Sequence, residues 1–135
     1  MNTSRQDGTP TDRHGESVAA INPELLFTNC VGSVSFALRM LKEFESSGMV
    51  AVETMAKHAA AADCTAVAGA AHSLKGVAGI IGAEPLRLLA AKIEAAGETA
   101  DIESIADLVG DIRQEMERCL VQIPIIRQRS QLATS

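Results

Sequence analysis

The strongest constraint on the fold is a run of apolar residues that recur every three or four positions near the C-terminus. Between positions 102 and 123 the run contains Ile102, Ile105, Val109, Ile112, Met116, Leu120 and Ile123. That spacing places all of them on one side of an α-helix. The sequence therefore predicts an amphipathic helix that begins near Asp101 and ends at Pro124, because proline does not continue a helix.

Similar spacing, divided by capping signals, predicts further helices. Asn22-Pro23-Glu24 is typical of a helix start, and Gly32-Ser33 restarts a second helix. We expect Ser46-Ser47-Gly48 to end that second helix and a third to close near Asp63. A fourth helix is expected over 65–81, with Gly82 as its C-terminal cap, and a fifth from Pro85 to Gly97.

No segment alternates apolar and polar residues with a period of two for more than a few positions, so no sheet is expected. We therefore expect an all-α fold, an antiparallel four-helix bundle with two shorter N-terminal helical elements packed at one end. The 135 residues suit one domain. We expect a flexible polar tail at 1–19, the bundle at 20–126 and a polar C-terminal tail at 127–135.

Composition narrows the class of partner and the compartment. The net charge is −5 and there are only three aromatic residues, which argues against a nucleic-acid partner. The chain has three cysteines, an odd number, and none has metal-ligand spacing: Cys30, Cys64 and Cys119. We therefore expect them to be free thiols that are buried as small apolar residues in a reducing compartment. No signal peptide and no stretch of about 18 apolar residues is apparent, so we expect a cytoplasmic protein without a membrane span.

The expected fourth helix carries one histidine, His72, on a side with few side chains. At about 100° per residue, three glycines and a threonine lie within about 60° of His72, and Lys75 lies about 60° to the other side. The small residues are Thr65, Gly69, Gly76 and Gly79. The opposite side, which we expect to face inward, collects Val67, Ala70, Leu74, Val77 and Ile81.

Glycine inside a helix costs about 0.8–1.0 kcal/mol relative to alanine, so three glycines should serve a purpose. Close packing of two helices would require them on the apolar side, whereas they share the side of His72, which favours a surface for docking. A neutral His72 is a suitable nucleophile at cytoplasmic pH, and Lys75 could neutralise an anionic group on it. No second catalytic group and no glycine-rich nucleotide loop is visible nearby, so we expect neither an ATP site nor autonomous catalytic machinery.

The segment Ala71-His72-Ser73-Leu74-Lys75-Gly76, followed by Gly82-Ala83 and by Ile93-Glu94 one helix later, resembles the histidine-containing phosphotransfer (HPt) domain of bacterial phosphorelays. The resemblance covers about 21–123. It implies that His72 is the phosphoacceptor, that Lys75 assists the phosphoryl group, and that Gly76 lets a receiver domain approach. At the position of Val77 many relatives have a small residue. We expect the valine to face inward and to change only the packing of the helix.

The resemblance also implies the partners. These are receiver domains of response regulators and a hybrid sensor kinase, with the phosphorylatable aspartate and Mg²⁺ supplied by the receiver. No cofactor is expected on this chain, and a monomer is expected. Two alternatives remain open: a helical adaptor that works without phosphorylation, and a phosphoacceptor domain from a larger hybrid or chemotaxis-type kinase.

Overall fold

The computed structural model describes residues 18–134, with side chains described through Gln131, and these residues form five helices. They are α1 (Pro23–Asn29), α2 (Val34–Ala60), α3 (Cys64–Ile81), α4 (Glu84–Glu98) and α5 (Ile102–Thr134). No strand occurs within this range. The all-α expectation is confirmed for these residues, while most of the expected N-terminal tail lies outside them.

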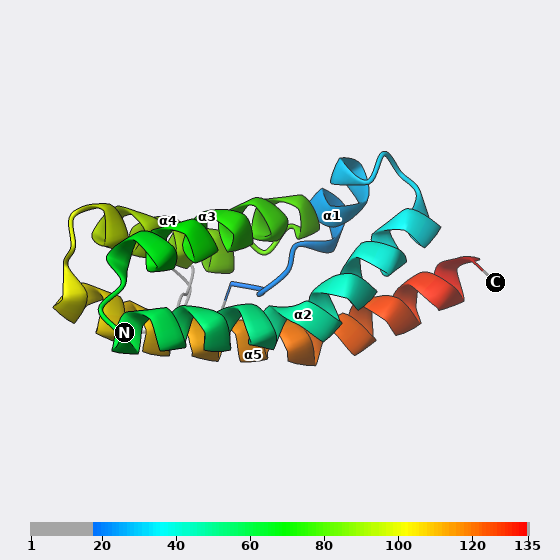
Figure 1. The fold of residues 1–135 in the computed structure, drawn as a ribbon. Coiled ribbons are helices and arrows are strands. Elements are labelled where there is room, and N and C mark those ends of the chain that lie inside the picture. The colour runs from blue at the N-terminus through cyan, green and yellow to red at the C-terminus, as the bar shows by residue number, and fades with distance from the viewer. Residues whose placement is uncertain (1–17, 135) are drawn as a thin grey trace, which may run out of the picture.

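The four long helices pack side by side, each running opposite to the one before it (Figure 1). In this view α3 and α4 form the upper layer and α2 and α5 the lower one, and α1 lies beside the C-terminal end of α3. Most of the apolar side predicted for the last helix faces the core, where Ile105, Ile112, Met116 and Ile123 are fully buried, whereas Ile102 at the start of α5 is 40% exposed. At about 1.5–3 kcal/mol for each buried aliphatic side chain, this stripe contributes much of the driving force for packing.

The predicted capping signals act as expected. The side-chain oxygen of Asn22 accepts hydrogen bonds from the backbone amides of Glu24 and Leu25, 3.0 and 3.2 Å away, at the start of α1. Ser33 caps α2 in the same manner. Gly82 ends α3 in the left-handed conformation, with φ of 78°. Each cap satisfies an amide or carbonyl that the helix itself leaves unpaired.

The four turns between helices share one hydrogen-bonding pattern, known as the Schellman motif. Gly32 also has positive φ (73°), and in each turn the equivalent residue has positive φ: Val31 (57°), Ala62 (56°), Gly82 (78°) and Ala100 (57°). Its amide bonds to a carbonyl three residues back, and the next amide bonds to a carbonyl five residues back. Glycine is usual at this position, because a residue with a Cβ loses roughly 1–2 kcal/mol there. Val31 is the least suited occupant, because it is β-branched.

The expected helix end at Ser46-Ser47-Gly48 is wrong, since α2 continues without interruption from Val34 to Ala60. The hydroxyls of Ser46 and Ser47 donate to the carbonyl of Glu43 within the helix. Gly48 is buried, and a Cβ built on it would lie 2.7 Å from the sulfur of Met116. This glycine therefore permits close approach of α2 and α5, and one short N-terminal helix exists where two were expected.

The expected end of the last helix at Pro124 is also wrong, because α5 continues to Thr134 with Pro124 inside it. Pro124 is exposed, so its ring is not part of the core. Beyond it, Ile126 and Ser130 are buried, and Arg127 forms an ion pair with Glu45 of α2 at 2.7 Å. Packing of this final segment against α2 offsets the loss that proline causes in a helix. Residues 127–134 are thus helical, contrary to the polar tail expected there.

Helix α3 is unusually apolar for one that carries a surface histidine. Over its 18 residues the mean hydropathy is 1.3, so by length and composition alone it could cross a membrane, although it contains polar residues such as His72 and Lys75. The core helix of a soluble protein passes the same test. Val67, Ala71, Leu74, Ala78 and Ile81 of α3 are buried in the core, which accounts for part of its apolar composition.

Candidate functional site

The predicted site residues lie along the outer side of α3. His72 has 68% of its side chain exposed, Gly69 and Gly76 are exposed, and Gly79 is half-buried. Thr65 is exposed two helical turns before His72, about 10 Å away along the axis. The structure therefore places these residues on one surface, as the periodicity predicted.

The buried stripe of α3 is rotated by about 40° from the predicted one, towards Lys75. Ala71 and Ala78 face the core in place of Ala70 and Val77, and Val77 is 38% exposed. The expectation that Val77 is an inward packing residue is therefore wrong. The rotation follows from α4, which packs along the Lys75 side of α3. It leaves Lys75 half-buried and turns Val77 outward.

Glu94 of α4 connects the two polar residues of the site. One carboxylate oxygen lies 2.8 Å from Nδ1 of His72, and the other accepts a hydrogen bond from Nζ of Lys75 at 2.6 Å. The Glu94 side chain is 18% exposed, against 68% for His72. A single anchored carboxylate therefore fixes the orientation of the imidazole and holds the lysine beside it.

The chemistry of Glu94 assigns the tautomer of His72. Hydrogen bonds from Lys75 and then His72 lower the pKa of Glu94, so at neutral pH it is a carboxylate that can only accept hydrogen bonds. Nδ1 of His72 must therefore carry the proton that it donates to Glu94. In the neutral ring this leaves Nε2 with its lone pair on the exposed side, where a nucleophile is needed.

The glycines of this surface have no packing role that the structure reveals. Apart from the adjacent residues and the nearby backbone of α3 itself, no described atom lies within 4 Å of a Cβ built on Gly69 or Gly76. Gly97 of α4 gives the opposite result, because its Cβ would lie 2.9 Å from the Cβ of Ala68 and from the carbonyl oxygen of Cys64. Close helix packing therefore explains Gly97 and leaves Gly69 and Gly76 unexplained by the fold.

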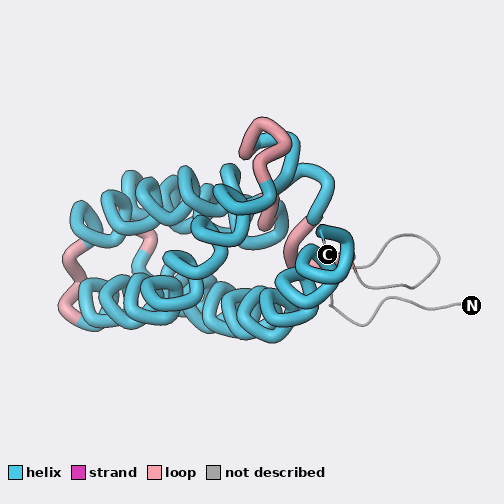
Figure 2. Tube along the Cα trace, turned by 90° about the vertical axis from the view of Figure 1, so that its right-hand side faces the viewer, coloured by secondary structure: helices cyan, strands magenta, loops and turns pink. Residues whose placement is uncertain are grey.

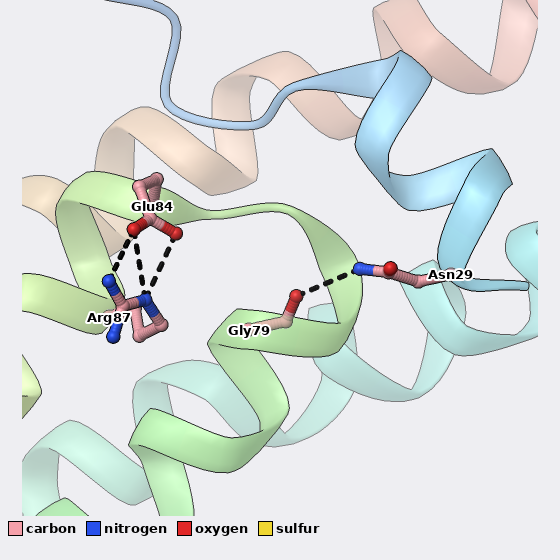
Figure 3. A network of polar contacts seen from close by, with 4 residues as sticks. All are labelled: Asn29, Gly79, Glu84 and Arg87. Carbon is pink, nitrogen blue, oxygen red and sulfur yellow. Dashed lines mark hydrogen bonds and ion pairs between the residues drawn. The ribbon is translucent and has the colours of Figure 1, made fainter.

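The C-terminal end of this surface is bordered by α1 and α4. Asn29 of α1 donates a hydrogen bond to the carbonyl of Gly79 at 3.1 Å (Figure 3). It also donates to the carbonyl of Ile80, at 3.1 Å. Arg87 of α4 places its Cδ 3.5 Å from where a Cβ of Gly79 would lie. Glu84 pairs with the guanidinium of Arg87, which lowers the pKa of Glu84 and fixes the arginine. Gly79 is thus partly covered, unlike Gly76.

Glu94 was not among the residues predicted for the site from helical spacing, although it belongs to the segments that carry the family resemblance. A helical wheel relates residues of one helix only, so it does not bring Glu94 to His72, which lies 22 positions earlier. The contact depends on the register between α3 and α4, which the close approach at Gly97 helps to set.

Other candidate groups lie outside this surface. Cys30 and Cys119 are buried free thiols and Cys64 is half-buried, so burial is confirmed for two of the three cysteines. Burial is the main cause that raises the pKa of Cys119 to about 12, so that thiol stays protonated. A groove between residues 18–20 and α5 contains none of the predicted site residues. Among the described residues, no group of three or more His, Cys, Asp or Glu side chains could hold a metal ion.

Comparison with known proteins agrees with this geometry. The sequence model of the Hpt domain matches residues 39–122, which is more than half of the chain. The fold is similar to the crystal structure of histidine-containing phosphotransfer protein B from Pseudomonas aeruginosa PAO1. The TM-score is 0.77 at 18% sequence identity, over 84% of this chain and 98% of that chain. No curated protein is significantly similar to this chain in sequence.

Proposed function

Because this chain belongs to the Hpt domain family and is a histidine phosphotransfer intermediate of two-component signalling, we propose that His72 is its phosphoryl carrier. The observation that carries this proposal is the contact of Nδ1 of His72 with Glu94, which directs Nε2 outward on a ring that is 68% exposed. Among the described residues, the other histidine, His58, is half-buried on α2 and lacks this arrangement, while His14 lies outside the described residues.

In the proposed reaction, Nε2 attacks the phosphorus of an aspartyl phosphate on a receiver domain. The new N–P bond forms as the bond between phosphorus and the aspartate oxygen breaks, and the aspartate leaves as a carboxylate. The phosphorylated ring keeps its proton on Nδ1 and gains a positive charge. The carboxylate of Glu94, 2.8 Å away, stabilises that charge. The reverse reaction passes the group to the aspartate of another receiver.

Lys75 has a supporting role in this proposal. Its ammonium group pairs with Glu94 at 2.6 Å, which compensates the carboxylate when the ring is neutral. Its positive charge also lies near the incoming phosphoryl oxygens and favours their approach. Lys75 thus acts first on Glu94 and then on the phosphoryl group, whereas the sequence suggested only the second role.

Hpt domains interact with receiver domains of response regulators and with kinases in relays. For this chain we propose that the receiver docks over Gly76, Gly69, Gly79 and Thr65 and brings the phosphorylatable aspartate and Mg²⁺. We further propose that helices α2–α5 act as an antiparallel four-helix bundle, that the protein is a cytoplasmic monomer, and that it needs no cofactor of its own. The open space over Gly76 supports the docking site.

The direct test is transfer from a labelled receiver. Incubated with a phosphorylated receiver domain from the same organism, the wild-type chain should gain an acid-labile, base-stable label. His72→Gln should lose that label completely, because glutamine lacks the nucleophilic nitrogen. His58→Gln is the matched control and should be labelled like the wild type. A persistent label in His72→Gln would overturn the assignment, and binding without any label would favour a phosphorylation-independent adaptor.

A further inference from the structure

Val31 combines two unfavourable features that the fold does not require. It occupies the positive-φ position of the turn between α1 and α2, with φ of 57°, and the residue is 91% exposed. The equivalent positions of the other three turns hold glycine or alanine. A β-branched residue is strained there, and an exposed apolar side chain makes too few internal contacts to offset the strain.

The turn itself is firmly held, so the position of Val31 is defined. The amide of Val31 donates to the carbonyl of Thr28 at 3.0 Å, and that of Gly32 donates to Phe27 at 2.8 Å. Cys30, directly before Val31, is buried in the core. The valine is therefore projected outward from an ordered turn by its anchored neighbours.

This turn is continuous with the surface around His72. Asn29, two residues before Val31, binds the carbonyls of Gly79 and Ile80 at the C-terminal end of that surface. In Figures 1 and 2 this turn lies above the layer formed by α3 and α4, beside the C-terminal end of α3. Gly79 is about 10 Å from His72 along the helix. One partner of a stable complex usually covers roughly 800 Å², a patch about 30 Å across. Because Asn29 is hydrogen-bonded to Gly79 and Val31 follows it by two residues, we infer that a patch of this size reaches from His72 to the turn.

The composition of this segment matches the centre of a protein interface. No Asp, Glu, Lys or Arg occurs from Leu25 to Leu38, although 21% of the chain is charged. Depletion of charge with exposed apolar side chains is the signature of an interface core. Phe36, within the same segment, is 42% exposed.

We propose that Val31 is a docking residue for the receiver domain, held outward so that it inserts into an apolar recess of that partner. This proposal rests on the proposed function of His72 and adds a contact that selects among receivers. A receiver with an apolar recess facing Val31 is favoured, and one with a charge at that point is rejected. Selection for docking, rather than for stability, accounts for valine at a position where glycine or asparagine would be less strained.

The test exploits the opposite signs that this proposal predicts for stability and binding. Val31→Asn relieves the strain, so its Tm should equal or exceed that of the wild type, by up to about 5 °C. Its affinity for the receiver that labels the wild type fastest should fall about tenfold. Calorimetry measures this affinity, with His72→Gln present both in the Val31→Asn protein and in the reference protein to prevent transfer. Val31→Ile keeps an apolar side chain and should retain binding within about threefold.

Ala100→Asn is the matched control, because Ala100 holds the same turn position at the opposite end of the helices. It should leave receiver affinity unchanged. The proposal would be overturned if Val31→Asn bound the receiver with wild-type affinity or failed to fold. It would also be overturned if sedimentation showed that Val31→Asn changes self-association while receiver binding is unchanged. At saturating receiver, Val31→Asn with His72 intact should still be labelled at the wild-type rate. Loss of that label would implicate chemistry instead, and a label on His72→Gln would overturn the proposed function itself.

Discussion

The properties of His72 depend on one residue of another helix. Glu94 accepts from Nδ1 of His72 and from Lys75, and it is itself mostly buried. This arrangement gives the exposed ring a fixed tautomer and a fixed direction, although little else touches it. A surface histidine without such a partner would rotate freely and expose either nitrogen.

The role of Glu94 predicts different effects for two substitutions. Glu94→Ala removes the acceptor for Nδ1, so we expect the single-turnover rate of phosphotransfer to fall roughly 10- to 100-fold, because the nucleophile is no longer oriented. Glu94→Gln retains an oxygen that can accept from Nδ1 and should keep a rate within about tenfold of wild type. Rapid-quench transfer from a phosphorylated receiver measures both. Equal losses in the two variants would show that the negative charge, and not the hydrogen bond, is required.

The pH dependence of these chains provides an independent check. The pKa of Glu94 is lowered in the folded state, so the stability from its contacts is fully present above the ordinary value near 4.5. It is lost as the pH falls through the lowered folded pKa. Glu94→Gln should therefore unfold with less acid dependence than the wild type in that range. Identical acid unfolding curves for the two proteins would contradict the contacts described at Glu94.

At the residue scale, the sequence was sufficient to predict which residues of α3 share the surface of His72. It was insufficient to predict how far α3 is rotated about its axis. His72, Gly69 and Gly76 share one surface because helical geometry requires it. Val77 is exposed because α3 is rotated about its own axis relative to the prediction, and that rotation depends on packing with α4. Glu94 could not be placed by spacing alone for the same reason.

At the scale of the helix, identical residue types serve opposite purposes. Gly97 of α4 faces Ala68 and the carbonyl of Cys64, where a Cβ would come within 2.9 Å. Gly76 of α3 has open space beside it. The first glycine is needed by the fold and the second is not, so the two can be separated by substitution.

We therefore predict contrasting results for Gly97→Leu and Gly76→Leu. Gly97→Leu should separate α3 from α4 and lower the free energy of unfolding by at least 1–3 kcal/mol, roughly the cost of overpacking. Gly76→Leu should raise it by roughly 0.5–1 kcal/mol, because leucine favours the helix. Phosphotransfer should nevertheless fall at least tenfold in Gly76→Leu, because the side chain keeps the receiver away from His72. Urea denaturation and transfer assays measure these effects, and normal transfer by Gly76→Leu would refute the docking surface.

The helix boundaries show which local signals are decisive. Asn22, Ser33 and Gly82 were predicted correctly because their side chains or conformations satisfy groups at the helix end itself. Gly48 and Pro124 resemble helix ends in sequence, yet both lie inside helices. Their effect on the local helix is smaller than the stabilisation from packing between α2 and α5, whose ion pairs join residues 60 and 82 positions apart.

At the scale of the molecule, the site and the longest helix are separate. His72, Lys75 and Glu94 belong to α3 and α4, whereas the last turns of α5 pack against the first half of α2 (Figure 1). The helices α2 and α5 thus provide a support on which the α3–α4 pair presents its outer surface. This separation allows stability to be changed without direct change to the reacting groups.

Deletion of residues 125–135 tests this separation. The shortened chain loses buried Ile126 and Ser130 and the ion pair of Arg127 with Glu45. We expect its free energy of unfolding to fall by about 2–3 kcal/mol, mainly from Ile126, and its Tm to fall by roughly 8–15 °C. Well below that Tm, labelling of His72 should proceed at the wild-type rate. Deletion of 132–135 alone is the control and should have a much smaller effect on Tm. If the folded chain without 125–135 were labelled slowly, the end of α5 would have to contribute to docking, and the support and the site could not be regarded as separate.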